Sequence, residues 1–170
     1  MGKIRMSRWA LFLVLAAAAR GGQDIPGVGP KEAFELLKDP AAVLVDVRSV
    51  AEYVLVGHPP RAYNVPFTFW SETKAEFEPN AGFVEDLKAR FKPADTLVFI
   101  CRSGRRSFRA AEAARAAGFP KVFSVNEGFE GEKDQAGRRT IGGWKGAGLP
   151  WTVDVDPALA YVFRAGKAPL

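Results

Sequence analysis

Apolar residues along this chain occur in short continuous runs, and segments with helical spacing lie between the runs. Two such runs cover residues 42–47 and 96–100, where nearly every residue is apolar or β-branched, and a third strand is expected at residues 121–125, which contain three apolar residues. Such runs are typical of strands that are buried on both faces of a parallel sheet. Residues 30–38 and 83–91 gather apolar side chains on one side and therefore predict helices. The alternation indicates an α/β fold, here a parallel sheet of about five strands with helices on both faces.

The segment from Thr96 to Gly118 is the one around which the chain is organised. Its apolar opening run is followed by a loop from Cys101 to Arg106 and then by residues 107–117, which are rich in Ala and contain neither Gly nor Pro. This last stretch predicts a helix that Gly118 can end. The only cysteine of the chain therefore lies between the carboxyl end of a strand and the amino end of a helix.

This position favours a reactive thiol at Cys101. The amino end of a helix offers free backbone N–H groups and the positive end of its dipole, and Arg102, Arg105 and Arg106 add fixed positive charge. Both effects favour the thiolate, which is the nucleophilic form of cysteine. A lone cysteine is more often a buried structural residue, but the nearby arginines argue against a buried apolar site.

Local signals complete the expected order of elements. Ser49 predicts the N-cap of a helix over residues 50–55, and Glu52 can complete a capping box with it. Residues 67–80 are aromatic and mixed in charge, and they predict no definite element. We expect a short strand at residues 62–65, a long loop at 126–148 and a short helix near 157–164.

The first twenty residues have the three-part pattern of a secretory signal. Lys3, Arg5 and Arg8 precede an unbroken apolar run at residues 9–19, which ends in small alanines. The run is short for a bilayer span, and small residues end it, so a cleaved signal is favoured over an uncleaved anchor. We therefore predict a signal peptide over residues 1–19, export to the periplasm, and no membrane span once the signal is removed.

The remaining chain is predicted to contain a short lead at residues 20–29 and a single domain over 30–170, in which residues 152–170 form a C-terminal extension. Removing residues 1–19 takes away three of the 24 basic residues and none of the 19 acidic ones, so the net charge falls from +5 to +2. This small charge gives little support for a nucleic-acid partner. One Cys and one His make neither a disulfide nor a usual zinc site, and we predict no metal and no cofactor.

Several short motifs together resemble the rhodanese-like domain, the fold of sulfurtransferases. They are LVDVR at residues 44–48, EY at 52–53, GHPPRAYNVP at 57–66, CRSGRRS at 101–107 and GLPW at 148–151. The resemblance covers about residues 28–151, and the cysteine loop after an apolar strand is its most specific part. The chain departs from the family pattern in three places. Pro59 and Arg61 are unusual residues for the turn, and Trp144 comes later than usual in the segment after Val125. The cysteine loop also lacks the residue patterns by which enzymes of the family with different sulfur donors are distinguished.

The resemblance implies a persulfide mechanism. The Cys101 thiolate would attack the outer sulfur of a small anionic donor such as thiosulfate, and the enzyme would pass that sulfur to a thiol, a cyanide-like anion or a protein. The implied substrate-binding residues are those of the loop and the first helical turn: Arg102, Ser103, Gly104, Arg105, Arg106 and Ser107. Ser103 and Gly104 allow the backbone to curl tightly, so that several N–H groups can point at one bound anion. Asp46 and Arg48, at a strand end, are expected to brace the loops.

Three alternatives stay open at this point. A cysteine-dependent phosphatase or arsenate reductase needs Arg at the seventh loop position, which is Ser107 here. A non-enzymatic sulfur carrier or redox relay that acts only with a protein partner would use the same cysteine. A Cys–His hydrolase would need His58, the only histidine, as its base, although a histidine beside two prolines is more simply a brace for its turn.

Overall fold

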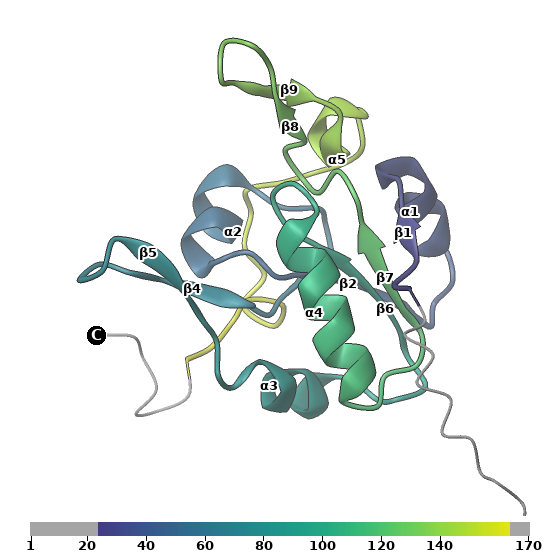
Figure 1. Cartoon of the computed structure of the whole chain (residues 1–170). Coiled ribbons are helices and arrows are strands. Elements are labelled where there is room, and N and C mark those ends of the chain that lie inside the picture. Colours follow the sequence, from purple (N-terminus) through teal and green to yellow (C-terminus); the bar gives the residue numbers. More distant parts are fainter. Residues whose placement is uncertain (1–23, 164–170) are drawn as a thin grey trace, which may run out of the picture.

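A five-stranded sheet, entirely parallel and in the order β1-β7-β6-β2-β3, forms the centre of the protein in the computed structural model, which describes residues 24–163 (Figure 1). Its strands are β1 (Gly27–Val28), β2 (Ala42–Asp46), β3 (Tyr63–Asn64), β6 (Thr96–Ile100) and β7 (Val122–Val125). The helices are α1 (Pro30–Leu36), α2 (Val50–Val56), α3 (Phe83–Arg90), α4 (Arg105–Ala116) and α5 (Gly143–Gly146). The predicted α/β class and five-stranded parallel sheet are confirmed.

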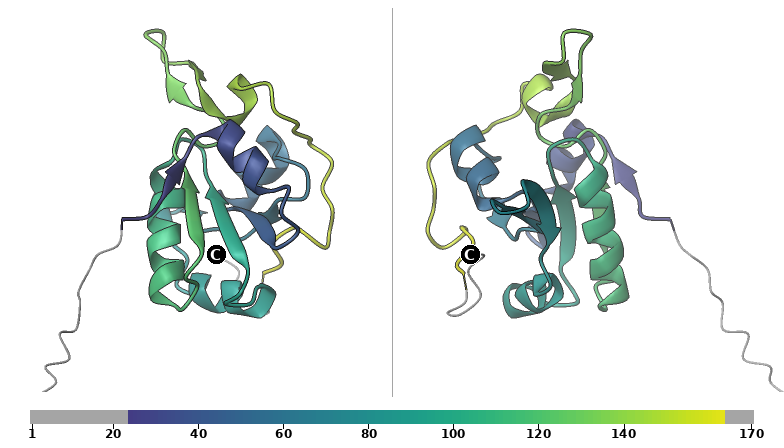
Figure 2. Two further views of the ribbon diagram at one scale, coloured as in Figure 1. Left: turned by 90° about the vertical axis from the view of Figure 1, so that its right-hand side faces the viewer. Right: turned by 60° about the vertical axis from the view of Figure 1, so that its left-hand side comes forward.

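Alternate residues of β6 point into two different hydrophobic clusters. Leu97 and Phe99 pack with side chains of α3 and α4, whereas Val98 and Ile100 pack with side chains of α1, α2 and α5. This alternation is the two-residue period of a strand that is buried on both faces. Figure 2 accordingly shows α4 and α1 on opposite sides of the sheet.

The parallel arrangement brings the segments that follow β2 and β6 to one edge of the sheet. β2 and β6 pair in register from Ala42 with Thr96 to Asp46 with Ile100, so the residues that follow both strands leave the sheet at the same level. Both α2 and α4 begin just beyond this edge. Ligands of open α/β sheets bind outside the carboxyl ends of the strands, and Cys101 lies at this position.

Two hairpins occupy segments for which the sequence predicted no strands. β4 (Thr68–Ser71) and β5 (Glu76–Pro79) form an antiparallel pair within residues 67–80, for which the sequence predicts no definite element. β8 (Glu132–Lys133) and β9 (Arg139–Ile141) form a second pair and are followed by α5, so the expected long loop at 126–148 is wrong. Both hairpins project beyond the sheet, β8–β9 past the amino end of α4 (Figure 1).

The helix expected near residues 157–164 is also wrong. Residues 157–160 form only a turn, in which the N–H groups of Leu159 and Ala160 donate to the Asp156 carbonyl, and residues 161–163 have no regular structure. The segment is held by a tertiary contact, because the Asn64 N–H donates to the Leu159 carbonyl at 2.8 Å. Within residues 24–163, no helix has both the length and the apolar character needed to cross a membrane. The predicted signal peptide at residues 1–19 lies outside the described residues.

Candidate functional site

The loop after β6 takes its shape from a glycine at the start of α4. Gly104 has a φ of 95° and is the N-cap of α4. A Cβ at this position would lie 1.8 Å from the carbonyl oxygen of Asn126, so a residue with a side chain cannot occupy it without displacing the backbone. In this conformation the Gly104 N–H donates to the Cys101 sulfur at 3.2 Å. The loop therefore curls tightly at Gly104, and one of its N–H groups, that of Gly104, reaches the sulfur.

Cys101 is more buried than the neighbouring arginines suggest. Its exposed fraction is 1 %, and it packs in the same cluster as Phe99 and Ala110. Its sulfur also lies 3.5 Å from the hydroxyl of Ser107, which accepts a hydrogen bond from the Ser124 hydroxyl at 3.0 Å. The expectation of a site away from apolar surroundings is thus wrong for the inner side of the residue, and its other side borders a pocket.

A pocket of about 420 Å³ opens over the cysteine, and it is rich in cationic side chains. Its lining residues are Cys101, Arg102, Ser103, Arg105, Arg106, Glu132, Lys133 and Arg139. Four of the six predicted substrate-binding residues line this pocket. The other two, Gly104 and Ser107, are buried behind it and contact the sulfur instead.

Arg106 is bound to an acid on another helix. Its two terminal nitrogens donate to the two carboxylate oxygens of Glu52 at 2.7 Å each. Glu52 also completes the predicted capping box of α2, because its carboxylate accepts the Ser49 N–H at 3.1 Å. Burial alone would raise the pKa of Glu52, but Arg106 and Ser49 hold that pKa below its ordinary value. No local pattern could have linked these partners, which are 54 residues apart.

The same interaction acts on the guanidinium of Arg106. Burial would lower its pKa, but hydrogen bonding and charge attraction from Glu52, followed by the charge on Cys101, raise that pKa above its ordinary value. The Arg106 guanidinium also lies 5.0 Å from the ring centre of Phe77 in β5. Arg106 is therefore held in one position between α2, the β4–β5 hairpin and the cysteine loop.

Asp46 and Arg48 form a buried ion pair beside the loop, outside the pocket lining. The Arg48 Nε and Nη2 atoms donate to Asp46 at 2.9 and 2.6 Å, and Nη2 also donates to the Gly57 carbonyl at 2.7 Å. The guanidinium lies 4.3 Å from the ring centre of Phe129. Burial would lower the pKa of Arg48, and the Asp46 carboxylate raises it above its ordinary value. The pair joins the end of β2 to two neighbouring loops.

His58 is placed as a packing residue. Its ring is buried and stacks on Tyr53, with 3.7 Å between centroids and 4° between planes, and its Nδ1 lies 3.1 Å from the Pro59 carbonyl. In the described part of the chain, the hydrogen-bond partners of the Cys101 sulfur are Gly104 and Ser107. This geometry gives no support to a Cys–His hydrolase.

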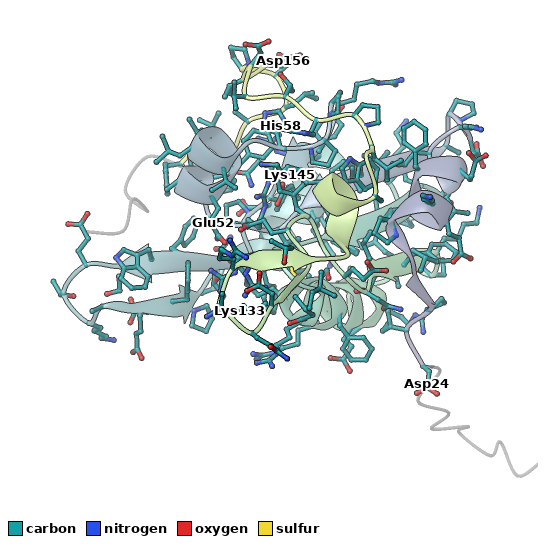
Figure 3. The ribbon with its side chains drawn as sticks, turned by 90° about the horizontal axis from the view of Figure 1, so that it is seen from above. Asp24, Glu52, His58, Lys133, Lys145 and Asp156 are labelled. Carbon is teal, nitrogen blue, oxygen red and sulfur yellow. The ribbon has the colours of Figure 1, made fainter. Side chains whose placement is uncertain are left out.

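The segment after β7 covers the outer backbone of the cysteine loop. The Phe129 N–H donates to the Cys101 carbonyl at 2.7 Å, and the Glu130 N–H donates to the Arg102 carbonyl at 2.9 Å. Gly128 permits this approach, because a Cβ there would lie 2.5 Å from the Cys101 carbonyl oxygen. The chain then enters β8, which brings Lys133 to the pocket. Seen from above, Lys133 and Glu52 lie on the same side of the molecule, whereas Asp24 lies at the opposite edge (Figure 3).

The residues between 24 and 163 include no group of three or more His, Cys, Asp or Glu side chains placed to hold a metal ion. The site is instead a buried thiol, a backbone N–H directed at its sulfur, and a cationic pocket above it. These groups can stabilise an anion that forms on or next to the sulfur.

Comparison with known proteins identifies the family of this fold. The family model of the rhodanese-like domain matches residues 29–135. The uncharacterized protein RC0915 of Rickettsia conorii is 35% identical over 119 residues, which are 68% of this chain and 87% of that protein. The crystal structure of Rv0390 from M. tuberculosis is similar with 36% sequence identity and a TM-score of 0.67, over 76% of this chain and 98% of that one. The solution structure of the rhodanese-like domain of the Alr3790 protein from Anabaena sp., 19% identical with a TM-score of 0.55 over 82% of this chain and 89% of that one, shares the fold. This chain belongs to the rhodanese-like domain family.

Proposed function

We propose that this protein is a sulfurtransferase that carries one sulfur atom on Cys101 as a persulfide. The observation that supports the proposal most is the position of the Cys101 sulfur, which accepts the Gly104 N–H at 3.2 Å and borders a pocket lined by several cations. The thiolate is the nucleophilic form of cysteine, and these donors and cations lie where it would react. A negative charge on an added sulfur atom would lie among the same donors.

The proposed reaction has two steps and no net oxidation or reduction of the protein. The Cys101 thiolate attacks the outer sulfur of thiosulfate, a new S–S bond forms, and the S–S bond of thiosulfate breaks as sulfite leaves with its electron pair. A nucleophilic acceptor, such as a thiolate, then attacks the outer sulfur of the persulfide. The Cys101–sulfur bond breaks, and the electron pair returns to the Cys101 thiolate.

Mass spectrometry of the full chain tests the first step. Incubation with thiosulfate should add about 32 Da, the mass of one sulfur atom, to the peptide that contains Cys101. The adduct should be lost on addition of a thiol reductant and should not form in Cys101→Ser. Absence of the adduct with several sulfur donors would refute the proposal. Hydrolysis of an aryl phosphate without any adduct would instead favour the phosphatase alternative.

Arg102 provides a second test, because it is exposed and lines the pocket. Arg102→Gln should raise the KM for thiosulfate about three- to tenfold with kcat within about twofold, since a partly solvated charge interaction is lost. Arg109→Gln removes the same charge from an exposed position of α4 outside the pocket lining and serves as the control. Equal effects of the two substitutions on KM would contradict a donor-binding role for Arg102.

We also propose that the protein is exported. The proposal is supported by the basic start and the apolar run of residues 1–19. Fractionation of a Gram-negative host that expresses the full chain, with sequencing of the amino terminus, tests it. A periplasmic product that begins near residue 20 is the expected result, and a cytoplasmic product that retains residues 1–19 would refute it.

A further inference from the structure

We infer that the β8–β9 hairpin forms a second anion-binding subsite, in which Lys133 and Arg139 hold a carboxylate group of the sulfur acceptor. The inference rests on the proposed function and names a substrate class for it: thiols that carry a carboxylate away from the sulfur. The structural basis is that both cations line the same pocket as Cys101 although they come from a different part of the chain.

The size of the pocket exceeds what a small donor needs. Its 420 Å³ is on the order of ten water volumes at about 30 Å³ each, and it falls within the range of sites that bind small organic molecules. Thiosulfate would fill only a fraction of this space. A second group of an organic substrate can therefore be accommodated beside the reacting sulfur.

The distribution of charge indicates where that group binds. After sulfite leaves, the persulfide anion occupies the position next to the Gly104 N–H and the loop cations. An acceptor that approaches this anion needs a separate cationic position for its own negative group. Among residues 24–163, Lys133 and Arg139 are the two lining cations outside the cysteine loop, and Glu132 is the only lining acid. The hairpin side of the pocket is therefore positive overall.

The hairpin is attached firmly enough to hold these side chains in place. Arg139 donates across the hairpin to the Gly131 carbonyl. Gly131 and Gly142 lie so close that a Cβ on Gly131 would be 2.7 Å from the Gly142 carbonyl oxygen. The Glu127 carboxylate accepts the Gly143 N–H at 2.8 Å. The base of the hairpin is thus joined to the segment that hydrogen-bonds to the cysteine loop, which fixes the distance between the two parts of the pocket.

A matched pair of acceptors tests the inference. Thiosulfate serves as donor, and the acceptors are mercaptopropionate and mercaptopropanol, which have the same carbon chain and differ in the carboxylate. The double variant Lys133→Gln/Arg139→Gln should raise the KM for mercaptopropionate about tenfold and the KM for mercaptopropanol less than about twofold. Lys133→Gln alone should raise the KM for mercaptopropionate about threefold, and it keeps the hydrogen bond from Arg139 to Gly131. Salt at about 0.5 M should reduce the preference of the unmodified protein for the carboxylate.

Arg138→Gln is the matched control. Arg138 lies on the same hairpin and carries the same charge, but its side chain is 76% exposed, pairs with Asp134 at 3.2 Å, and is not part of the pocket lining. Its replacement should change the KM for either acceptor by less than about twofold. An effect on mercaptopropionate as large as that of Lys133→Gln would show a general charge effect and would overturn the inference.

Alkylation of Cys101 separates this inference from the proposed function, because it requires no sulfur transfer. The reagents are the para isomers of (bromomethyl)benzoate and (bromomethyl)benzamide, and their rates are compared by mass spectrometry. The unmodified protein should react faster with the benzoate than with the amide. The ratio of these two rates should be at least about threefold smaller in the double variant. If thiosulfate forms no persulfide but the preference behaves as expected, the function fails and the subsite stands. If the preference is absent, or persists in the double variant, the subsite is refuted.

Discussion

Replacing Arg106 with Gln should destabilise the contact between α2 and the amino end of α4. The substitution removes two charge-assisted hydrogen bonds of 2.7 Å between side chains that are 17% and 14% exposed. It leaves the Glu52 carboxylate with Ser49 as its hydrogen-bond partner. Hydrogen bonds to charged groups contribute about 1.5–3 kcal/mol each, and the remaining exposure lowers that figure here, so we expect a loss of about 2–3 kcal/mol in the free energy of unfolding. For a chain of this length, this corresponds to a fall in Tm of roughly 5–10 °C.

Urea unfolding followed by circular dichroism measures the loss. Arg109→Gln is the control, because Arg109 lies on the same helix and its guanidinium is 5.7 Å from the ring centre of Phe67; it should cost less than about 1 kcal/mol. A double-mutant cycle with Glu52→Gln should give a coupling energy of about 1.5–3 kcal/mol. A coupling energy below about 0.5 kcal/mol would refute the assignment of stability to this pair.

The coupling should also depend on pH. The folded chain holds the pKa of Glu52 below the ordinary value of 4.5, so folding favours the ionised carboxylate. The resulting stability is fully present above pH 4.5 and is lost as the pH falls through the lower folded value. The stability difference between the unmodified chain and Glu52→Gln should therefore be constant near neutral pH and shrink in acid. A difference that grows as the pH falls would contradict the sign of this shift.

Two further substitutions address the backbone of the loop and the buried ion pair. Gly104→Ala should abolish sulfur transfer and cost at least about 3 kcal/mol in the free energy of unfolding, because its Cβ would lie 1.8 Å from the Asn126 carbonyl oxygen. Gly118 also has a positive φ, of 101°, but open space surrounds it, so Gly118→Ala should cost only about 1–2 kcal/mol. If the two substitutions lower the free energy of unfolding in urea equally, the steric explanation is refuted. Arg48→Met should cost about 3–5 kcal/mol, since it removes the ion-pair partner of the buried Asp46 side chain, and adding Asp46→Asn should recover a large part of that loss. No recovery in the thermal or urea unfolding of the double variant would show that the charge is not the cause.

The parts of the fold that the sequence predicted are those in which local pattern and tertiary structure agree. The apolar run at residues 96–100 became β6, and the Ala-rich stretch after the loop became most of α4. The capping box at Ser49 and Glu52 was also predicted and is present. In each case, a few neighbouring residues carry the whole signal, through burial on both faces, helix propensity or a reciprocal cap.

The second hairpin, which the sequence did not predict, has only a weak local pattern. β8 and β9 contain two and three residues, and most of them are exposed, so no apolar alternation marks them. Their only local signal is glycine: Gly131, Gly137 and Gly142 all have positive φ, and Gly131 lies against the carbonyl of Ile141. A loop at these residues gives no sign that Lys133 and Arg139 would lie at the pocket.

The structure brings the predicted loop residues together around the cysteine, and it adds partners that the sequence did not predict. The sequence places Arg106 near Cys101 through the strand–loop–helix order, and the pocket contains both. It gives no sign that Glu52 would bind Arg106, because that contact depends on how α2 and α4 are packed at one edge of the sheet. The local sequence therefore predicts which reactive and charged side chains lie near the cysteine. The packing of distant elements decides which of those charges are paired within the protein and which can bind a ligand.

The hydrogen bond between Asn64 and Leu159 shows that the folded domain includes residues well beyond α5. β3 is the last strand on its side of the sheet, and an uncovered strand offers its backbone to other molecules. The late segment occupies that position, with the Asn64 N–H bound to the Leu159 carbonyl. A fragment cut where the family match stops, at residue 135, would lose this cover together with the buried Trp144. Such a fragment would retain Cys101 but would be prone to self-association through its open sheet margin.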